Sequence, residues 1–143
     1  MYNTQSLLKK LKIDGLKYTI YEHQALFSVK DSRENRGSIQ GSHTKNLFLK
    51  NKKNEFFLFS CNEKTEINLK MLSKTLALGN ISFAKHDHLY QYLGVKPGSV
   101  SPFGLLNDIE NKVKFFLDSS LLREIMINFH PLINTSTLSI NIH

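Results

Sequence analysis

The sequence predicts one α/β domain of the α+β type, in which a mixed, largely antiparallel β-sheet is surrounded by helices. The chain has 143 residues, a length typical of a single domain. Short apolar runs and helical patterns follow one another irregularly, which argues against a doubly wound parallel sheet. One β-hairpin is evident, and a hairpin pairs its strands antiparallel. We therefore expect residues 1–143 to form a single domain.

The expected helices are recognised by a capping residue at the start and, in most cases, a glycine at the end. Side chains of Asn, Ser, Thr and Asp accept hydrogen bonds from the free N–H groups of a first helical turn. Glycine readily adopts the left-handed conformation that terminates a helix. The expected caps are Asn3 or Thr4, Ser28, Asn68 and Asp87, and these helices run to about residues 12, 36, 78 and 93. The glycines expected to end the last three helices are Gly37, Gly79 and Gly94.

The expected strands are short apolar or alternating runs. The clearest pair is Asn46–Leu49 and Glu55–Phe59, which a polar insert at residues 50–54 separates as in a β-hairpin. Residues 37–43 and 95–104 are rich in Gly, Ser and Pro or otherwise polar, and we expect loops there. The remaining expected strands cover residues 18–21, 81–84, 112–117, 125–129 and 138–140.

The charge of the chain suggests a polyanionic partner without establishing one. The formal net charge is +7 and the sequence pI is about 9.5, values that favour binding to nucleic acid. Of the 19 basic residues, 16 are Lys and only 3 are Arg. A genome of low GC content would produce the same lysine excess with no functional meaning, so charge alone leaves RNA or DNA binding open.

The cysteine content and the apolar runs bear on the compartment. Cys61 is the single cysteine, so no disulfide can form within the chain, and a reducing compartment fits. No apolar run approaches the roughly 20 residues of a membrane-spanning helix. The first 15 residues lack the apolar stretch of a signal peptide. We therefore expect a cytoplasmic protein that has no membrane partner.

Three segments carry residues suited to binding or catalysis, and each also has a plain structural interpretation. Lys45 beside Asn46, at the entrance of a predicted strand, could hold a phosphate or ribose oxygen, or could protect a sheet edge. The Gly98–Pro102 loop could aim backbone N–H groups at an anion or oxyanion, or could be a simple connection. His130, at the end of an apolar strand, could contact a ligand or fill a structural role.

Two further groups give weaker signals. Cys61 could act as a nucleophile, but a lone cysteine that ends a strand is more often a small buried apolar residue. His86 and His88 are two positions apart, so they do not share a helix face, and no third metal ligand lies close in sequence. We therefore expect neither a metal nor a cofactor.

Three sequence segments together resemble one family. They are TKNLFL at residues 44–49, LGVKPGSVSPFGLLND at residues 93–108 and FHPLINTSTLSI at residues 129–140. From about residue 3 to residue 140 the chain resembles the free-standing prolyl-tRNA editing proteins, which belong with the YbaK-like and synthetase-associated deacylase domains. The combination of the three segments looks most like the alanyl-tRNA(Pro) deacylase branch. The sequence stops at residue 143, where relatives usually continue into a last helix, so either the protein is shorter than its relatives or the sequence ends before that helix, and the C-terminal edge is left open.

The resemblance implies a reaction, a partner and a set of site residues. The reaction is hydrolysis of the ester that joins a wrong amino acid, with alanine the first choice, to the 3′ adenosine of tRNA(Pro). It implies no metal and no covalent enzyme intermediate. The implied partners are the acceptor end of tRNA(Pro) and, transiently, prolyl-tRNA synthetase or an elongation factor. Lys45 and the loop residues Gly98, Ser99, Val100 and Ser101 match the catalytic positions, and Asn46, Pro102 and His130 match the substrate-binding positions.

The amino-acid pocket and the alternatives remain expectations. Apolar residues Phe27, Val29 and Ile39, together with the Gly98–Pro102 loop, are expected to form a pocket wall that excludes proline by size. One alternative is a deacylase for cysteine- or serine-charged tRNA, and another is a tRNA-binding or synthetase-associated module without activity. A third is single-stranded RNA binding through lysines 50, 52 and 53, although no aromatic residues are interleaved with them.

Overall fold

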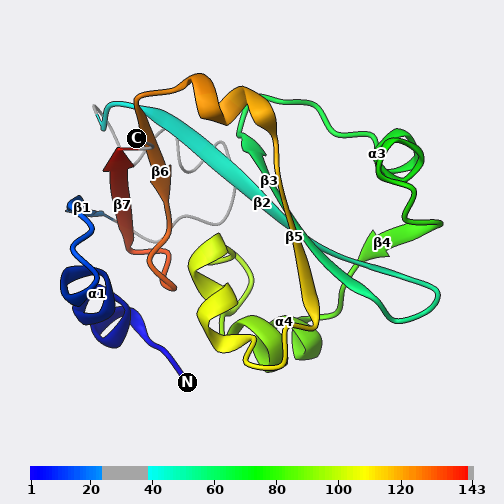
Figure 1. Cartoon of the computed structure of the whole chain (residues 1–143), viewed down its shortest axis with the longest axis horizontal. Coiled ribbons are helices and arrows are strands. Elements are labelled where there is room, and N and C mark those ends of the chain that lie inside the picture. The colour runs from blue at the N-terminus through cyan, green and yellow to red at the C-terminus, as the bar shows by residue number, and fades with distance from the viewer. Residues whose placement is uncertain (24–38, 142–143) are drawn as a thin grey trace.

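A seven-stranded sheet forms the centre of the structure, a computed structural model that describes residues 1–23 and 39–141 (Figure 1). The strand order is β1-β7-β6-β2-β3-β5, and β4 pairs with β2. Only the β2–β6 and β3–β5 pairs are parallel, so the predicted mixed, largely antiparallel sheet is confirmed. The strands are β1 Tyr18–Glu22, β2 Ser42–Asn51, β3 Phe56–Asn62, β4 Ile81–Phe83, β5 Val113–Leu117, β6 Met126–Phe129 and β7 Ser136–Asn141.

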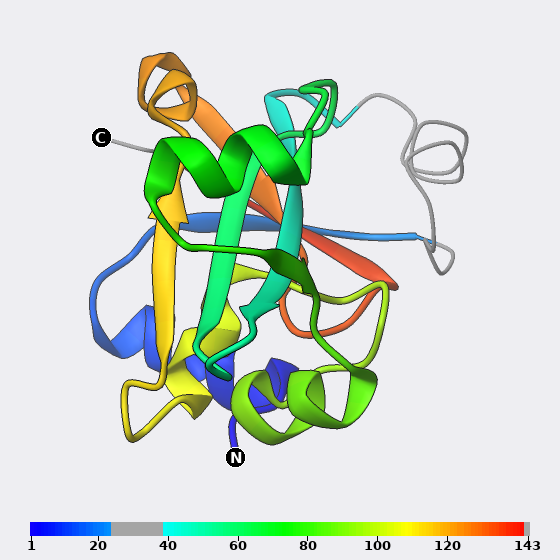
Figure 2. The same ribbon diagram turned by 90° about the vertical axis from the view of Figure 1, so that its right-hand side faces the viewer.

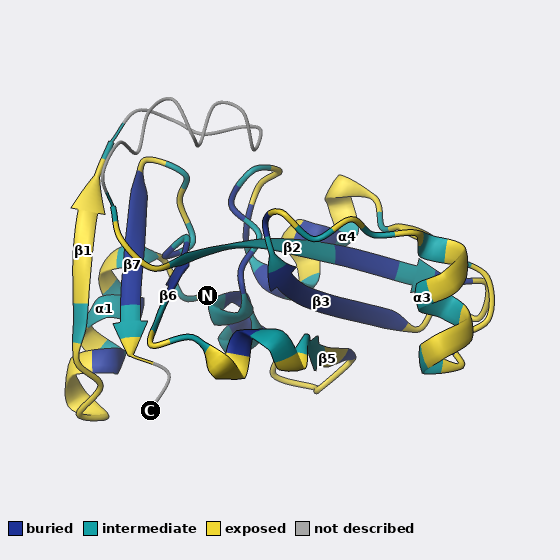
Figure 3. Cartoon of the chain, turned by 90° about the horizontal axis from the view of Figure 1, so that it is seen from above, coloured by how far each residue is buried: buried dark blue, intermediate teal, exposed yellow. Residues whose placement is uncertain are grey.

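Strand β2 connects the two halves of the sheet. Figure 3 shows it running from the β1–β7–β6 half on one side to the β3–β5 half on the other. Its first residues, Ser42 and His43, pair with β6, and the strand pairs with β3 from Thr44 onward. The prediction of a loop through residue 43 is therefore wrong. These polar residues give no apolar pattern, and their pairing with β6 depends on close approach at Gly41, where a Cβ would lie 2.9 Å from Met126.

Helices surround the sheet as predicted. The α-helices are α1 Thr4–Ile13, α3 Leu69–Leu76 and α4 His86–Leu93, and the 3₁₀-helices are η1 Pro102–Asn107 and η2 Ser119–Arg123. In Figure 1, α1 lies beside β1 and β7, whereas α3 lies beside β4 at the other end. Figure 2 shows α1 and α4 at the same end of the strands. The predicted caps Asn3 and Asn68 are confirmed, since each side chain accepts hydrogen bonds from its first helical turn.

Three local predictions need correction. The residue before α4 is Lys85, not Asp87, which lies in the first turn, where a carboxylate still favours the helix dipole. Helix α3 ends at Leu76, and its left-handed C-cap residue is Ala77 and not Gly79. The predicted loop of residues 95–104 contains the start of η1, because Pro102 suits a first helical position and Ser101 caps it. The helix predicted for residues 28–36 lies outside the described residues.

The β2–β3 hairpin is buried on both faces, which makes it the centre of the core. Since strand side chains alternate between faces, neighbouring residues of each strand pack against different helices. On one face, Phe48 and Leu58 pack in a cluster with Leu89 and Leu93 of α4, and Val100 and Leu132 lie against this cluster. On the other face, Leu49, Phe57 and Leu78 form a cluster against which residues of α3 pack. Segments 98–102 and 130–132 therefore approach the same face of the hairpin.

Candidate active site

The sheet has a break in pairing at Lys45 and Asn46. One edge of β2 pairs with β6 at residues 42–43 and with β4 at residues 49–51. Between these positions, no strand in the described part of the chain pairs with that edge. The opposite edge pairs continuously with β3. A strand that changes partners in this way has backbone N–H and C=O groups between the two pairings that make no ladder hydrogen bonds with a strand of the described residues, and these groups can bind a ligand.

Lys45 lies inside β2 and not at its entrance, because the strand begins at Ser42, four residues earlier than predicted. It is half-buried and is the cross-strand partner of the fully buried Cys61. Burial raises the pKa of the Cys61 thiol to about 11, although the nearby Lys45 charge acts in the opposite direction. The thiol is therefore protonated at neutral pH, which disfavours the interpretation of Cys61 as a nucleophile.

Replacement of Cys61 by alanine is expected to leave hydrolysis unchanged. The protonated thiol supplies no nucleophile, and the main cost is a small cavity of about 1 kcal/mol in stability. The test compares single-turnover deacylation rates and melting temperatures of the Cys61→Ala variant and the wild type. A large loss of rate at an unchanged melting temperature would contradict this assignment and restore a chemical role for the thiol.

Asn46 lies on the face of β2 opposite to Lys45. Its cross-strand partner is Ser60, whose hydroxyl donates to Asn46 Oδ1, and Asn46 Nδ2 donates to Thr44 Oγ1 at 3.3 Å. The amide orientation is therefore fixed by two hydroxyl groups, and an amide nitrogen has a second hydrogen to donate. At the break, the side chains of Lys45 and Asn46 therefore lie on opposite faces of β2 and do not line one wall together.

The Gly98–Pro102 loop begins with a tight turn. The Ser99 N–H donates to the Lys96 carbonyl oxygen at 3.1 Å, and Gly98 has a φ of 88°, which favours glycine. Ser99 is buried and Ser101 is fully buried, with its hydroxyl accepting from the Phe103 N–H at 3.2 Å. The buried serines fix the loop against the core, and the Ser99 N–H is already used within the turn.

His130 follows directly after β6, close to a hydrogen bond that joins β6 to β2. Thr44 Oγ1 donates to the Asn128 carbonyl oxygen at 2.8 Å, so Lys45 and His130 each lie within two residues of this contact. His130 Nδ1 lies 3.1 Å from the Ser136 carbonyl oxygen, which makes Nδ1 the protonated nitrogen. The His130 ring also meets that of His23, with centroids 6.4 Å apart.

The predicted pocket wall is only partly described by the structure. Ile39 is half-buried, and its carbonyl oxygen accepts a hydrogen bond from His43 Nε2 at 3.1 Å, so it lies beside the start of β2. Phe27 and Val29 lie outside the described residues, and their part in the wall stays a prediction. The structure thus brings the Ile39 end of this wall next to the strand that carries Lys45.

Three residues near the candidate site were not predicted from the sequence. Thr44 joins β2 to β6, Ser60 orients Asn46, and His23 contacts His130 through its ring. Ser60 could have been found, because the hairpin register follows once the turn is placed. Thr44 and His23 could not, since their partners are distant in sequence and give no local signal.

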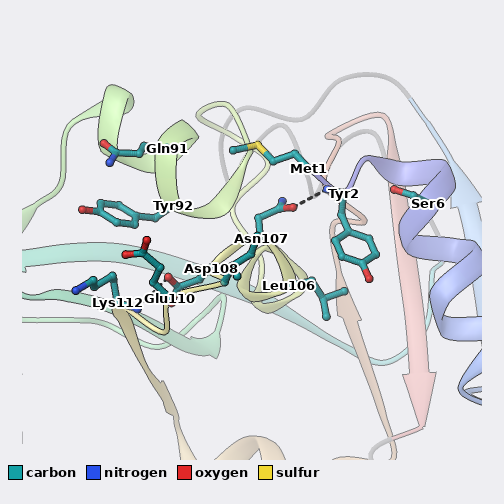
Figure 4. A pocket seen from close by; sticks show the side chains of 11 residues that line it. Met1, Tyr2, Ser6, Gln91, Tyr92, Leu106, Asn107, Asp108, Glu110 and Lys112 are labelled. Carbon is teal, nitrogen blue, oxygen red and sulfur yellow. Dashed lines mark hydrogen bonds between the residues drawn. The ribbon is translucent and has the colours of Figure 1, made fainter.

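A separate pocket of about 630 Å³ lies near the N-terminus, away from the candidate site (Figure 4). It is lined by the start of the chain, by α4 residues Gln91 and Tyr92, and by residues 106–110 and Lys112. Asn107 links the N-terminus to α4. Its Oδ1 accepts a hydrogen bond from the Tyr2 N–H at 2.6 Å, and its Nδ2 donates to the Leu93 carbonyl oxygen at 2.9 Å. None of the predicted site residues lines this pocket.

The described residues offer no group of three or more His, Cys, Asp or Glu side chains that could bind a metal ion. Within the same residues, no helix combines the length and the apolar character needed to span a bilayer.

The fold and the candidate site define an α+β domain with a half-buried lysine at a break in the pairing of β2, and with a Gly98–Pro102 loop that approaches the opposite face of the β2–β3 hairpin. This arrangement suits a ligand with anionic and carbonyl oxygens. A family model for the aminoacyl-tRNA editing domain matches residues 23–143, so the chain belongs to the aminoacyl-tRNA editing domain family.

Similar proteins agree with this family. The chain is 30% identical over 135 residues to the prolyl-tRNA editing protein ProX of Acetoanaerobium sticklandii, and the alignment covers 94% of this chain and 82% of that protein. It is 32% identical over 141 residues to prolyl-tRNA synthetase associated domain-containing protein 1 of Bos taurus, with 95% and 82% covered. The resemblance to the prolyl-tRNA editing proteins is thus confirmed at the level of the family.

Solved structures support the fold. The structure of the hypothetical protein APE2540 superimposes with a TM-score of 0.76 at 13% identity, covering 95% of this chain and 88% of that chain. A structure described as a candidate trans-editing enzyme for prolyl-tRNA synthetase gives a TM-score of 0.73 at 18% identity, covering 99% and 88%. At these identities, the similarity establishes the α+β architecture and nothing finer.

Proposed function

We propose that this chain hydrolyses mischarged aminoacyl-tRNA(Pro), with alanyl-tRNA(Pro) as its substrate, and releases the free amino acid and tRNA. The observation that supports this most directly is Lys45, a lysine on β2 at the break between its β6 and β4 pairings, in a member of the aminoacyl-tRNA editing family. The proposal includes the assignment to the alanyl-tRNA(Pro) deacylase branch. It also includes a cytoplasmic location, where charged tRNA is used, and transient contact with prolyl-tRNA synthetase or an elongation factor.

In the proposed mechanism, the protein positions an ester that is already activated. Lys45 holds a phosphate or ribose oxygen of the terminal nucleotide as a point charge. Backbone N–H groups of the Gly98–Ser101 loop stabilise the oxyanion that forms when water attacks the carbonyl carbon. Because the Ser99 N–H donates within its own turn, we assign this role to the N–H groups of Gly98, Val100 and Ser101.

The attacking water and the amino acid are assigned to the face of β2 that carries Asn46, which is the face that the Gly98–Pro102 loop and the segment after His130 approach. His130, whose Nδ1 donates to the Ser136 carbonyl oxygen, lies directly after β6, and we assign to its ring the orientation of the water or the substrate. The Asn46 amide, held by Ser60 and Thr44, can donate its second hydrogen there. A substrate 2′-hydroxyl can assist proton transfer. No step needs a metal ion.

The proposal is tested with a panel of tRNA(Pro) charged with alanine, glycine, serine, cysteine or proline, each assayed with and without EDTA. We expect fast hydrolysis of Ala-tRNA(Pro), weak hydrolysis of the serine ester and none of the proline ester. Selectivity against glycine should be modest, about 1–3 kcal/mol for one methyl group. EDTA should change none of the rates.

Each alternative corresponds to a different outcome of the panel. A preference for the serine or cysteine ester would mean that the protein is an aminoacyl-tRNA deacylase with a different amino acid as its substrate. Binding of tRNA without hydrolysis of any ester would favour a non-catalytic tRNA-binding module. Hydrolysis of Pro-tRNA(Pro) as fast as Ala-tRNA(Pro) would contradict editing, because the enzyme would then destroy the correct product. Loss of activity with EDTA that zinc restores would overturn metal independence.

A further inference from the structure

The turn between β2 and β3 carries a basic surface that the proposed mechanism does not use. In Figure 1 this turn projects at the end of the molecule opposite α1. Lys52 and Lys53 are exposed at the turn, and two hollows of about 350 and 330 Å³ flank it. Lys52 lines both hollows. Lys50 lines the first, and Lys53 and Lys114 line the second. These four lysines are called the hairpin-tip surface below.

The positive charge of the hairpin-tip surface is largely uncompensated. Glu55 is the one acidic residue that lines either hollow, and its Oε1 accepts a hydrogen bond from Asn51 Nδ2 at 2.9 Å. Among residues 1–23 and 39–141, the ion pair is Lys10–Asp14 at the end of α1, so it does not involve a lysine of the hairpin-tip surface. Four lysines against one carboxylate, in a chain of net charge +7, make this surface complementary to a polyanion.

The backbone that carries these lysines is held in place by the buried Asn51. Its Oδ1 accepts from the N–H groups of Lys53 and Glu55, each at 3.0 Å. Its Nδ2 also donates to the Leu78 carbonyl oxygen at 3.1 Å, which ties the turn to the segment after α3. A fixed turn loses less conformational freedom on binding than a mobile one, so the lysines are already held near their binding positions and the entropic cost of binding is lower.

The distance from Lys45 indicates which part of an RNA this surface would meet. Lys52 follows Lys45 by seven residues along an extended strand, which places it about 20 Å away. We propose that the hairpin-tip surface binds phosphates of the double-helical acceptor stem of tRNA. This inference rests on the proposed function, in which the 3′ end of the tRNA lies at Lys45.

Backbone contact is favoured over base stacking at this surface. Proteins bind RNA duplexes mainly through shape, phosphates and 2′-hydroxyls, whereas single strands are usually bound by stacking on aromatic rings. Phe57 is the one aromatic residue that lines either hollow, and it is buried. Phe83 is 61% exposed on β4, but it lines neither hollow. A single-stranded probe therefore belongs in the test.

The test compares a Lys52→Ala/Lys53→Ala variant with a control, Lys9→Ala/Lys12→Ala, that removes the same charge from exposed positions of α1. Binding of uncharged tRNA(Pro), of an acceptor-stem minihelix and of a single-stranded ACCA oligonucleotide is measured over a range of NaCl concentrations. For tRNA and minihelix, the slope of log affinity against log salt should fall by about 2 in the first variant, roughly one per lysine. Binding of ACCA should stay unchanged, and the control should keep the wild-type slope.

Several outcomes would overturn the inference. An unchanged slope in the hairpin-tip variant would do so, as would an equal change in the control or an equal loss of ACCA binding. The binding assay does not need hydrolysis, so the two proposals fail separately. A protein that shows the expected slopes but hydrolyses no ester would refute the proposed function alone. A protein that hydrolyses Ala-tRNA(Pro) and keeps its slope in the hairpin-tip variant would refute the acceptor-stem contact alone.

Discussion

Replacement of Lys45 by alanine is expected to nearly abolish hydrolysis of Ala-tRNA(Pro) while the fold persists. Lys45 is half-buried on β2 at the break between its β6 and β4 pairings. Its proposed partner is a phosphate or ribose oxygen of the terminal nucleotide. The loss of a charge-assisted contact costs about 1.5–3 kcal/mol. This corresponds to a reduction of roughly tenfold to more than a hundredfold in kcat/KM.

The measurement is kcat/KM for deacylation, together with the single-turnover rate at saturating enzyme and the melting temperature. The control is Lys9→Ala, which removes an equal charge from an exposed position on α1. A Lys45→Ala variant that deacylates at the wild-type rate would show that the site is assigned to the wrong place. A parallel loss in Lys9→Ala would mean that general charge, and not the position of Lys45, drives substrate binding.

Replacement of Gly94 by alanine is expected to cause the largest loss of stability among glycine replacements near the N-terminal pocket. Gly94 ends α4 with a φ of 67°, and a Cβ there would lie 2.5 Å from Asn107 Nδ2. The left-handed conformation alone costs about 1–2 kcal/mol for a residue with a side chain. Displacing Asn107 also weakens its hydrogen bonds to Tyr2 and Leu93, for a total of about 3 kcal/mol.

The matched control is Gly79→Ala, because Gly79 has a φ of 75° and a Cβ there would meet nothing within 4 Å. Both variants bear the conformational cost, and only Gly94→Ala adds the clash. In thermal unfolding, Gly94→Ala should lower the melting temperature by roughly 10 °C and Gly79→Ala by clearly less. Equal shifts would mean that Asn107 moves aside at little cost and does not hold the N-terminus to α4.

The elements that were predicted correctly are those whose determinants are local. The hairpin follows from two apolar runs and a polar insert, and the caps Asn3 and Asn68 act within one helical turn. The missed parts depend on distant partners. Ser42 and His43 form a strand because β6 lies beside them, and η1 forms where a glycine- and proline-containing segment packs under α4. The pairing with β6 leaves no trace in local composition, whereas the local signals for η1, Pro102 and the Ser101 cap, stand in a segment whose Gly, Ser and Pro content favours a loop.

The candidate site shows the same division. Its residue types and order along the chain were available from the sequence, through the resemblance of Lys45, the Gly98–Pro102 loop and His130 to the editing family. Their arrangement was not. The strand register alone shows that Lys45 and Asn46 lie on opposite faces of β2, and the turn at Lys96 shows that the Ser99 N–H is already engaged.

The long reach of β2 toward β6 has a consequence for biosynthesis. The hydrogen bond between Thr44 and Asn128 spans 84 residues, and that between His23, the residue after β1, and Thr137 of β7 spans 114 residues. Contacts between such distant segments are slow to form, because the chain loses the conformational entropy of a long loop before the contacts stabilise it. On the ribosome, the residues from Lys45 to the Gly98–Pro102 loop emerge well before β6 and β7. The nascent chain therefore cannot complete the candidate site until β6 and β7 have been synthesised, and until then it exposes an unpaired edge of β2 to other chains.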